Sequence, residues 1–378
     1  MDTKPEIALP SAQSLFDRII QFSIRNAIWV MLFTLTWIAV GLYSYQKLSI
    51  DAVPDITNVQ VQINSQANGF TAAEVEQRIT YPIENAMSGM PNLEQTRSIS
   101  RYGLSQVTII FKDGTDIYWA RQLINQRLQE AQSALPDNID PQMSPISTGL
   151  GEIYQWVIKA EPNAKKADGS AYTAMDLREI QDWIVRPQLQ RVAGVAEVNS
   201  IGGYNKTYIV SPDLKRLQQL QIPVTDLQTA LTENNENRGA GFLEQNGQQL
   251  TVRVPGTLNS IQDIENVMLS QKNGLPIRVA DVATVSIGHD LRTGGATYNG
   301  EETVLGIAMM MMGENSKTVA QALDHKMQEV KRSLPEGVVV ETVYNRSSLV
   351  DKAIKTVAKN LIEGAILVIV IPVSYTHL

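Results

Sequence analysis

The chain has 378 residues, a net charge of −7 at pH 7 and no cysteine, which excludes disulfides, thiolate metal sites and cysteine nucleophiles. Its basic residues are scattered rather than gathered into a stripe, which argues against nucleic acid as a partner. Only three histidines occur, His289, His325 and His377, so a metal site would depend on carboxylates or thioethers.

The N-terminal region, residues 1–26, is predicted to be a polar tail followed by an interfacial helix. Apolar residues recur at helical spacing over residues 15–24, with Asp17, Arg18 and Arg25 interspersed. This pattern is typical of an amphipathic helix that lies along a membrane surface. The alternative, an ordinary soluble helix, is disfavoured by the apolar segment that follows.

Residues 27–47 are predicted to form a transmembrane helix. Residues 27–45 carry no charge, and at about 1.5 Å per residue this run measures roughly 28 Å, close to the thickness of the hydrocarbon layer. It begins too far from Met1 for a cleaved signal peptide, and no small-residue cleavage site follows it. The flanking basic residues favour a cytoplasmic N-terminus, with the following region outside the membrane on the other side.

The joint after this helix, residues 48–64, contains Asp51, Pro54 and Asp55 and then alternates apolar with polar residues. Alternation with a period of two indicates a half-buried strand. Asp51 and Asp55 are candidates for drawing cations toward an entrance between the membrane and the folded region. The alternative, which is commoner for aspartate at such a joint, is a structural role in hydrogen-bonding a turn.

Beyond the joint, the sequence predicts two units with the same β-α-β-β-α pattern and a closing strand, which is the split-βαβ arrangement of an α+β fold. The first unit has strands at 58–65, 93–101 and 104–111 and helices at 71–88 and 115–134. The second has strands at 153–160, 195–202, 302–312 and 338–343 and helices at 174–192 and 316–334. Thr71 and Glu74 have the spacing of a capping box at the first helix.

Two further segments complete the chain. Residues 204–283 interrupt the second unit and include a long polar hairpin at 233–253. Residues 348–373 have the composition of the start of a second membrane helix, but the clean apolar run is less than about half of a bilayer crossing. Residues 374–378 do not continue it, so we expect the chain to be a fragment or to carry a foreign tail.

Several of these motifs resemble the heavy-metal efflux subfamily of the resistance–nodulation–division (RND) transporters. Residues 49–61 (SIDAVPDITNVQV) are similar to that subfamily's joint after its first membrane helix, and residues 148–154 (TGLGEIY) to the start of its second porter subdomain. Residues 312–319 (MGENSKTV) and 343–352 (VYNRSSLVDK) are most similar to its cobalt–zinc–cadmium branch.

The resemblance implies an α+β membrane protein with one transmembrane helix, two ferredoxin-like porter subdomains, an inserted docking subdomain and a truncated second transmembrane helix. The expected boundaries are an N-terminal tail and interfacial helix at 1–26, transmembrane helix 1 at 27–47, the first porter subdomain at 48–147, the second porter subdomain at 148–203 and 284–347, the docking subdomain at 204–283, transmembrane helix 2 at 348–373 and an atypical tail at 374–378.

It also implies a function, the N-terminal half of a proton-driven inner-membrane pump that exports Zn²⁺, Co²⁺ or Cd²⁺. Such a pump is a transporter rather than an enzyme, has no cofactor besides its transported ion, and works as a homotrimer with a periplasmic adaptor and an outer-membrane channel. The polar hairpin would insert into the adjacent protomer. The proton-relay carboxylates and most metal-coordinating residues lie outside the matched half, so this part could not transport alone.

Two alternatives remain open. One keeps the family but changes the transported ion to Cu(I) or Ag(I), and the other is a membrane-anchored periplasmic scaffold or binding module without transport. No phosphate-binding loop, catalytic triad or nucleotide motif is present, so the energy for transport would come from the membrane.

Glu152 is the candidate metal contact. It follows a flexible turn at 149–151 and is expected to open a strand that faces the cleft of the porter domain, where a carboxylate suits zinc. The alternative is a surface or capping glutamate. The methionine run at 309–312 carries thioethers, which favour Cu(I). Adjacent strand residues face opposite sides of a sheet, so we interpret the run as core packing by adaptable side chains.

Overall fold

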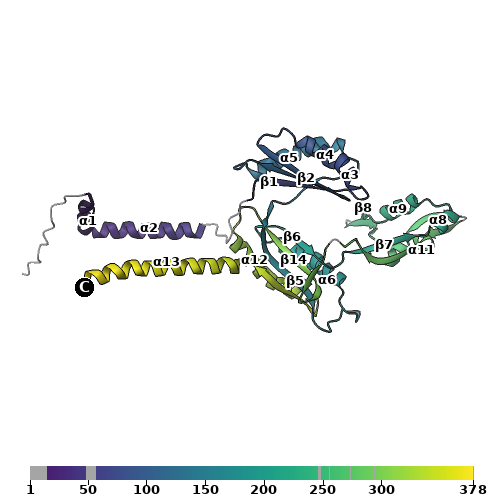
Figure 1. Ribbon diagram of the computed structural model, residues 1–378. Helices are drawn as coiled ribbons and strands as arrows, with labels where there is room; N and C mark the ends of the chain where they lie inside the picture. Colours follow the sequence, from purple (N-terminus) through teal and green to yellow (C-terminus); the bar gives the residue numbers. More distant parts are fainter. Residues whose placement is uncertain are drawn as a thin grey trace, which may run out of the picture. The chain divides into compact units, whose positions relative to one another are not determined.

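The computed structural model describes residues 15–47, 57–245, 248–254, 256–272, 274–292 and 294–377. They form two compact units, one with the two N-terminal helices and one with everything from the first strand onward (Figure 1). Asp51 and Asp55 lie outside the described residues, so the cation-attracting role expected of them stays a prediction.

The N-terminal unit consists of helices α1 (Leu15–Arg25) and α2 (Ala27–Lys47). By length and composition, α2 is able to cross a membrane. Its large apolar side chains are exposed, with Trp29 at 70% and Phe33 at 64% of full exposure. Because water disfavours so much uncovered apolar surface, lipid is the solvent that suits this helix.

The first α/β subdomain, residues 57–145, follows the predicted β-α-β-β-α-β order. Its strands are β1 (Gln60–Gln66), β2 (Leu93–Arg101), β3 (Leu104–Phe111) and β4 (Gln142–Met143), and its helices are α3 (Ala72–Val75), α4 (Tyr81–Met87) and α5 (Ile117–Ala131) with a 3₁₀ turn, η2 (Gln132–Ala134). The antiparallel strands lie in the order β2-β3-β1-β4. Alternate residues of the central strands, such as Ile63 and Ile109, pack with Ile83 and Ile124 of the helices in one core.

The second α/β subdomain repeats this plan in two stretches, residues 147–201 and 296–345. Its strands are β5 (Ser147–Ala160), β6 (Val195–Ile201), β13 (Ala296–Tyr298), β14 (Glu301–Met311) and β15 (Val338–Asn345), and its helices are α6 (Ala174–Ile180), α7 (Arg186–Leu189) and α12 (Ser316–Val330) with a 3₁₀ turn, η4 (Lys331–Ser333). The pairing β6-β14-β5-β15 matches β2-β3-β1-β4 position by position, and β13 adds to the other end of β14.

Trp156 is the largest fully buried side chain and lies at the centre of the second core. Its Nε1 donates a hydrogen bond to Oε1 of the buried Gln181 over 2.9 Å, which satisfies both polar groups away from water. The residue opposite on β14 is Gly306, and a Cβ at that position would collide with the indole ring. The missing side chain therefore gives the indole its place over β14.

The insert takes the place of one tight turn of the repeated plan. In the first subdomain, β2 and β3 are joined by Tyr102 and Gly103 alone. In the second, the equivalent strands β6 and β14 are joined by residues 202–300, yet they pair as neighbours. The entropic cost of closing a loop grows slowly with its length, so a folded insert is tolerated here. Both ends of the insert consequently emerge from adjacent strands.

Each subdomain has a π-helical turn two residues before a proline in its first helix. The turn η1 (Glu76–Thr80) precedes Pro82, and η3 (Gln181–Val185) precedes Pro187. Proline lacks an N–H and its ring crowds the carbonyl four residues earlier, and a wider turn relieves that contact without ending the helix. The helices predicted at 71–88 and 174–192 are therefore composite, and the second ends at Leu189.

Both of these composite helices begin with a capping box. The predicted one is confirmed, because the Thr71 hydroxyl accepts from the Glu74 N–H while the Glu74 carboxylate accepts from the Thr71 N–H. The hydrogen bonds from the Thr71 backbone and hydroxyl hold the pKa of Glu74 below its ordinary value. Thr173 and Asp176 form the same arrangement at α6, so the helix start is repeated as well as the strand order.

The insert has two small cores and its own strand pairing. Its elements are β7 (Lys206–Pro212), α8 (Leu214–Leu220), α9 (Val224–Glu233), β8 (Arg238–Gln245), β9 (Gln248–Val254), α10 (Ile261–Glu265), β10 (Met268–Lys272), β11 (Leu275–Arg278), α11 (Val279–Val282) and β12 (Ala283–His289). Strand β12 pairs with β7 along its whole length, and Val285 belongs to the insert's core. The boundary expected at 283 falls on the first residue of β12, so the insert continues to His289.

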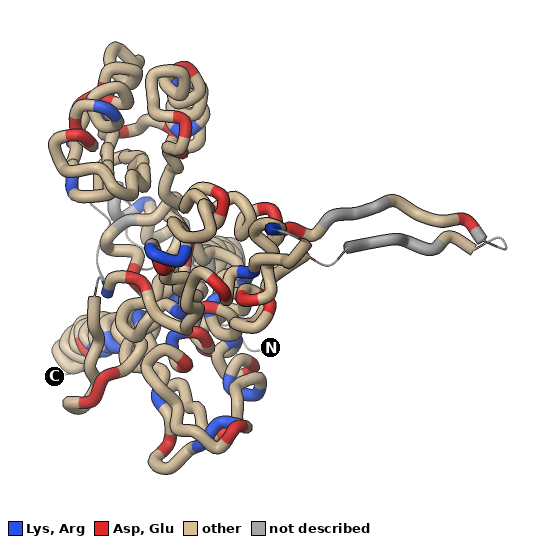
Figure 2. Tube along the Cα trace, turned by 90° about the vertical axis from the view of Figure 1, so that its right-hand side faces the viewer, with Lys and Arg blue, Asp and Glu red and all other residues tan. Residues whose placement is uncertain are grey.

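The polar hairpin is formed by β8 and β9, which pair with each other and, among the described strands, with no other. Figure 2 shows its described part as a two-stranded arm. Phe242 and Leu243 on this arm are 61% and 62% exposed. The hairpin predicted at 233–253 is confirmed, except that Glu233 still belongs to α9.

Helix α13 (Arg346–His377) corrects the expectation for the end of the chain. A stop near Val373 was expected, with residues 374–378 outside the helix, but the helix continues through Thr376 to His377. The Thr376 hydroxyl donates to the carbonyl oxygens of Pro372 (3.0 Å) and Val373 (2.9 Å). A hydroxyl satisfied by its own helix need not end that helix. By length and composition, α13 is also able to cross a membrane.

A substitution at Gly202 tests how closely the chain packs at the root of the insert, where it leaves β6. The φ of Gly202 is +82°, and a Cβ would lie 2.6 Å from the Thr303 carbonyl oxygen and 2.9 Å from the Ala296 nitrogen. Gly300 has a similar φ of +85° but open space around it, so Gly300→Ala reports the backbone strain alone. We expect Gly202→Ala to destabilise the second subdomain by about 1–3 kcal/mol more than Gly300→Ala. Hydrogen exchange of the β14 amides measures the difference, and equal exchange in the two variants would contradict the packing described.

Candidate functional site

Glu152 lies inside a strand rather than at its start. Strand β5 begins at Ser147, so the expectation that Glu152 opens the strand after a turn at 149–151 is wrong. Residues 149–151 lie within the strand's bounds, but the pairing with β14 passes over them, from Met309–Glu152 to Met311–Ser147. The Leu150 carbonyl accepts a 2.6 Å hydrogen bond from Nη1 of Arg346, which fixes this part of β5 to the start of α13.

A β-bulge decides which way Glu152 faces. Tyr154 pairs with Ala308 and Glu152 with Met309, so Ile153 is the extra residue on β5. Ile153 and Tyr154 are both buried in the second core, although consecutive strand residues normally face opposite sides. The bulge therefore shifts the alternation by one residue and returns Glu152 to the side opposite the core.

Glu152, Met309 and Glu197 form a row across three adjacent strands. Met309 on β14 is opposite Glu152 of β5 on one side and opposite Glu197 of β6 on the other. Directly opposed residues on antiparallel strands share a face, with Cα atoms about 4.5–5.5 Å apart. All three side chains are half-buried. The sheet thus presents two carboxylates with a thioether between them on the face away from its core.

Neutral donors hold this row. Nε2 of Gln155 donates to Oε2 of Glu152 over 3.1 Å, and the Ser147 hydroxyl donates to Oε1 of Glu197 over 3.3 Å. Nδ2 of Asn199 points to Sδ of Met309 at 3.5 Å. Within the part of the chain that the structure describes, neither Glu152 nor Glu197 has a lysine or arginine partner. Arg186 lines the same polar hollow as Glu197 and Asn199, but among the described contacts it forms no ion pair with Glu197.

This arrangement fits transient contact with a cation better than tight coordination. No group of three or more His, Asp or Glu side chains able to hold a metal ion occurs among the described residues. Carboxylates are good ligands for zinc, and a closed site takes four ligands at about 2.0–2.3 Å. Two carboxylates on strands that flank a third strand can bind a passing divalent ion only in part, leaving room for water or for donors from elsewhere.

The methionines at 309–312 and the histidines lie in different parts of the fold, and only Met309 belongs to the row. Core packing was expected for residues 309–312, but only Met310 is buried, because the strand alternation places Met309 and Met311 on the other side. His325 is on the surface of α12, 3.8 Å from Glu329. His289 is also exposed and stacks on Tyr204, with ring centres 4.6 Å apart. Neither histidine lies in the Glu152–Met309–Glu197 row.

Glu197, Asn199 and Met309 were not predicted from the sequence to be neighbours of Glu152. The three strands are separated in sequence, and their register, including the bulge at Ile153, decides which residues meet. The alternation of polar and apolar residues in β6 places Glu197 and Asn199 on one side, and this was the available signal.

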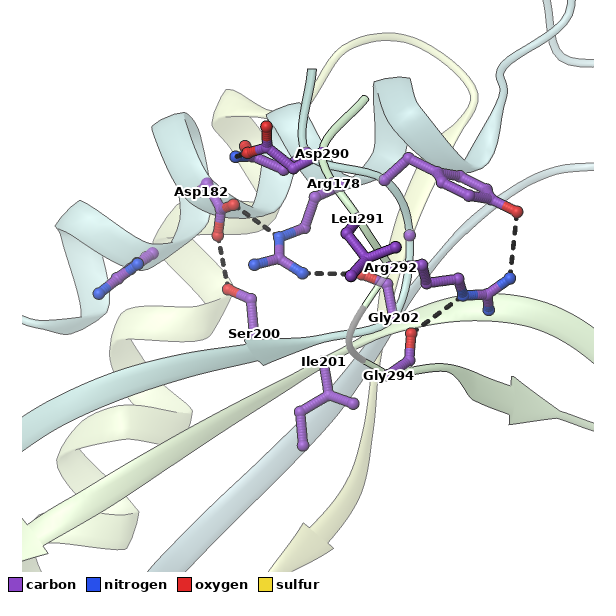
Figure 3. A pocket seen from close by; sticks show the side chains of 13 residues that line it. Arg178, Asp182, Ser200, Ile201, Gly202, Asp290, Leu291, Arg292 and Gly294 are labelled. Atoms are coloured by element: carbon purple, nitrogen blue, oxygen red, sulfur yellow. Dashed lines mark hydrogen bonds and ion pairs between the residues drawn. The ribbon is translucent and has the colours of Figure 1, made fainter. Parts of the chain in front are cut away.

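A polar hollow of about 610 Å³ lies at the root of the insert (Figure 3). On one wall, Nε of Arg178 donates to Asp182 over 2.6 Å and Nη1 donates to the Gly202 carbonyl over 2.8 Å. The Ser200 hydroxyl donates to the other oxygen of Asp182 over 2.6 Å. These bonds tie α6 and η3 to the point where the chain leaves β6 for the insert.

Arg292 makes the matching connections where the chain returns. Its Nε donates to the Gly294 carbonyl over 3.0 Å, and its Nη1 donates to the Tyr204 hydroxyl over 3.1 Å. Nη2 forms a 2.6 Å ion pair with Glu302 at the start of β14. We call Arg178, Asp182, Tyr204 and Arg292 the clasp. The carboxylates that contact these arginines, Asp182 and Glu302, are both engaged in ion pairs. We therefore interpret the hollow as the place where the insert is held to the second subdomain, not as a metal site.

Arg292→Ala tests the clasp. The substitution removes two hydrogen bonds and one partly exposed ion pair, which together are worth about 1–2 kcal/mol. We expect faster hydrogen exchange in residues 203–206 and 288–292, with unchanged exchange around the buried Trp156. Lys326→Ala is the matched control, because Lys326 pairs with Glu329 inside one helix and should leave these connectors unaffected. Unchanged exchange in the connectors of Arg292→Ala would show that the clasp does not hold the insert.

These features define an α/β protein with two copies of one subdomain plan, the second with a clasped insert. Along the chain, the two copies are preceded and followed by a helix long and apolar enough to cross a membrane. The chain belongs to the AcrB/AcrD/AcrF family, whose sequence pattern matches residues 19–374.

The similar proteins include cation transport proteins. The chain is 57% identical over 357 residues to "Cation efflux system protein CzcA" of Alcaligenes sp. and to "Cobalt-zinc-cadmium resistance protein CzcA" of Cupriavidus metallidurans, in each case over 94% of this chain and 34% of the relative. It is 34% identical over 359 residues to "Cation efflux system protein CusA" of Escherichia coli, again over 94% of this chain and 34% of the relative. The chain thus spans about a third of the length of the curated relatives it matches.

The fold resembles a solved heavy-metal efflux pump. The X-ray structure titled "heavy metal efflux pump, crystal form II" superposes with a TM-score of 0.81 at 31% identity, covering 93% of this chain and 34% of that chain. Crystal form I gives a TM-score of 0.80 at 30% identity over the same shares. The mixed α/β architecture is therefore that of a heavy-metal efflux pump over nearly the whole chain.

Proposed function

We propose that this chain is the N-terminal part of a proton-driven pump that exports divalent heavy-metal cations, Zn²⁺, Co²⁺ or Cd²⁺, across a bacterial inner membrane. The observation that carries the proposal is 57% identity, over 94% of the chain, to proteins named for cation efflux and for cobalt, zinc and cadmium resistance. The proposal makes the protein a secondary transporter rather than an enzyme, and its metal ion is cargo rather than a cofactor.

The Glu152–Met309–Glu197 row supports a divalent cargo. Two half-buried carboxylates, hydrogen-bonded only to neutral donors, lie on the face of the sheet away from its core and attract cations, and a single thioether adds affinity for borderline metals. In this proposal Glu152 and Glu197 contact the ion on its way through the periplasmic domain. Asp51 and Asp55 remain proposed as cation-attracting groups at the entrance beside the membrane.

The two α/β subdomains are proposed to be porter subdomains, and the insert to be a docking subdomain. The arm formed by β8 and β9 pairs with no other described strand and exposes Phe242 and Leu243, which suits insertion into a neighbouring copy within a homotrimer. A periplasmic adaptor and an outer-membrane channel complete the proposed assembly. Helices α2 and α13 are proposed to cross the bilayer, with the α/β subdomains in the periplasm.

A second candidate keeps the family and changes the cargo to Cu(I) or Ag(I). Met309 is the observation that favours it, because soft cations prefer thioethers and this sulfur lies on the open face. Its flanking carboxylates favour divalent ions instead, and for that reason we place this candidate second.

Metal resistance of a sensitive bacterial host carrying the complete gene tests the proposal. We expect protection against zinc, cobalt and cadmium, and a several-fold loss of that protection in Glu152→Gln combined with Glu197→Gln, because the variant removes both negative charges and keeps the side-chain shape. Glu161→Gln is the control, since Glu161 is an exposed carboxylate just after β5. Protein levels are compared by immunoblot.

Two outcomes distinguish the identity of the transported ion from the role of the two glutamates. Protection against copper and silver alone would overturn the divalent cargo. Unchanged zinc, cobalt and cadmium resistance in the double variant, at equal protein levels, would overturn the role of the two glutamates while leaving the exporter itself standing.

A further inference from the structure

Helix α1 is amphipathic, and its apolar side is uncovered. Arg18, Gln21 and Arg25 follow one another at spacings of three and four residues, so they share one face. The remaining faces carry Ile19, Ile20, Phe22 and Ile24, whose side chains are between 54% and 62% exposed. The polar face also includes Asp17, four residues before Gln21, so its two arginines and one aspartate give it a net charge of +1. A helix with a narrow polar face of net positive charge and a broad apolar face is typical of the boundary between water and lipid.

The position of α1 relative to α2 places it at that boundary. The Asn26 N–H donates to the Phe22 carbonyl over 2.9 Å and closes α1, while its carbonyl accepts from Val30 N–H over 3.2 Å and opens α2. Nδ2 of Asn26 also donates to the Phe22 carbonyl, over 3.1 Å. Figure 1 shows that α1 turns away from the axis of α2. If α2 crosses the bilayer, α1 lies where that crossing begins.

We propose that α1 is a peripheral anchor that recognises the phosphate groups of anionic phospholipids at the membrane surface next to the start of α2. Within the described residues, neither Arg18 nor Arg25 forms an ion pair. The guanidinium fork matches phosphate oxygens in pairs, and a basic cluster beside a membrane helix is attracted by an acidic leaflet. The apolar residues supply insertion into any lipid, and the two arginines supply the preference for anionic headgroups.

The anchor has a consequence for the membrane helix. Only Asn26 separates α1 from α2, so the depth at which α1 settles fixes the height at which α2 enters the bilayer. Anionic lipid therefore sets the position of α2 along the membrane normal. This role concerns the placement of the protein in the membrane and is independent of which cation the protein transports.

The absence of cysteine from the sequence makes a direct test possible. Single cysteines at Phe22, on the apolar side, and at Gln21, on the polar side, are spin-labelled in the full chain and reconstituted in vesicles of phosphatidylcholine with or without phosphatidylglycerol. Collision rates with oxygen and with a water-soluble nickel chelate report the depth of each label. Gly41→Cys is the reference, because nothing in the structure lies within 4 Å of a Cβ there and the label reports whether α2 is inserted.

We expect the Phe22 label to collide mainly with oxygen and the Gln21 label mainly with nickel. Phosphatidylglycerol should raise the oxygen-to-nickel ratio at Phe22 several-fold, and Arg18→Gln with Arg25→Gln should abolish that rise while the Gly41 label stays buried in lipid. Arg18→Lys with Arg25→Lys should retain part of it. Equal accessibility at Phe22 and Gln21 would overturn the anchor. A Phe22 depth that ignores phosphatidylglycerol would overturn the recognition of anionic headgroups.

Discussion

The pairing of β14 with β5 on one side and β6 on the other is the interaction on which the rest of the second subdomain depends. On one face it brings Trp156 over Gly306 and closes the core. On the opposite face it aligns Glu152, Met309 and Glu197. It also makes neighbours of the two strands between which the insert is placed, so a single register fixes the core, the carboxylate row and the root of the insert.

The first subdomain shows the same plan without an insert. Its strands have the same order, its first helix has the same capping box and π-helical turn, and Tyr102 and Gly103 join the equivalents of β6 and β14. A turn at the edge of a sheet is exposed and tolerates insertion. The clasp then supplies the connections that a tight turn would have made, because Arg178 and Arg292 each bind a backbone carbonyl beside the connectors.

The regular features of the fold were predictable from local patterns. Strands β2 and β3 begin and end at the predicted residues, since alternation and flanking turn residues mark both ends. The repeat, the capping box at Thr71 and the apolar length of α2 also follow from residues close together in sequence. These signals fix which elements form and in what order.

The features that were missed depend on contacts between distant residues or on small departures from regular geometry. The π-helical turns follow from proline crowding within a helix whose apolar pattern reads as continuous. The bulge at Ile153 depends on the partner strand, so Glu152 could be singled out while Glu197 and Met309 could not be placed beside it. The helix α13 continues past Val373 to His377, and there the Thr376 hydroxyl bonds back to its own helix instead of ending it.

The proposed path of the cation is tested most directly by asking whether a divalent cation reaches Met309, on the face of the second sheet away from its core. Co²⁺ is paramagnetic, so it broadens the NMR signals of nearby methyl groups, and the chain labelled with ¹³C at its methionine methyls offers Met309 together with Met87, which is fully buried in the first core. We predict that the Met309 signal broadens at the lowest Co²⁺ concentrations while the Met87 signal is unchanged. A Met309 signal that stays sharp, or that broadens only together with Met87, would contradict the proposed path.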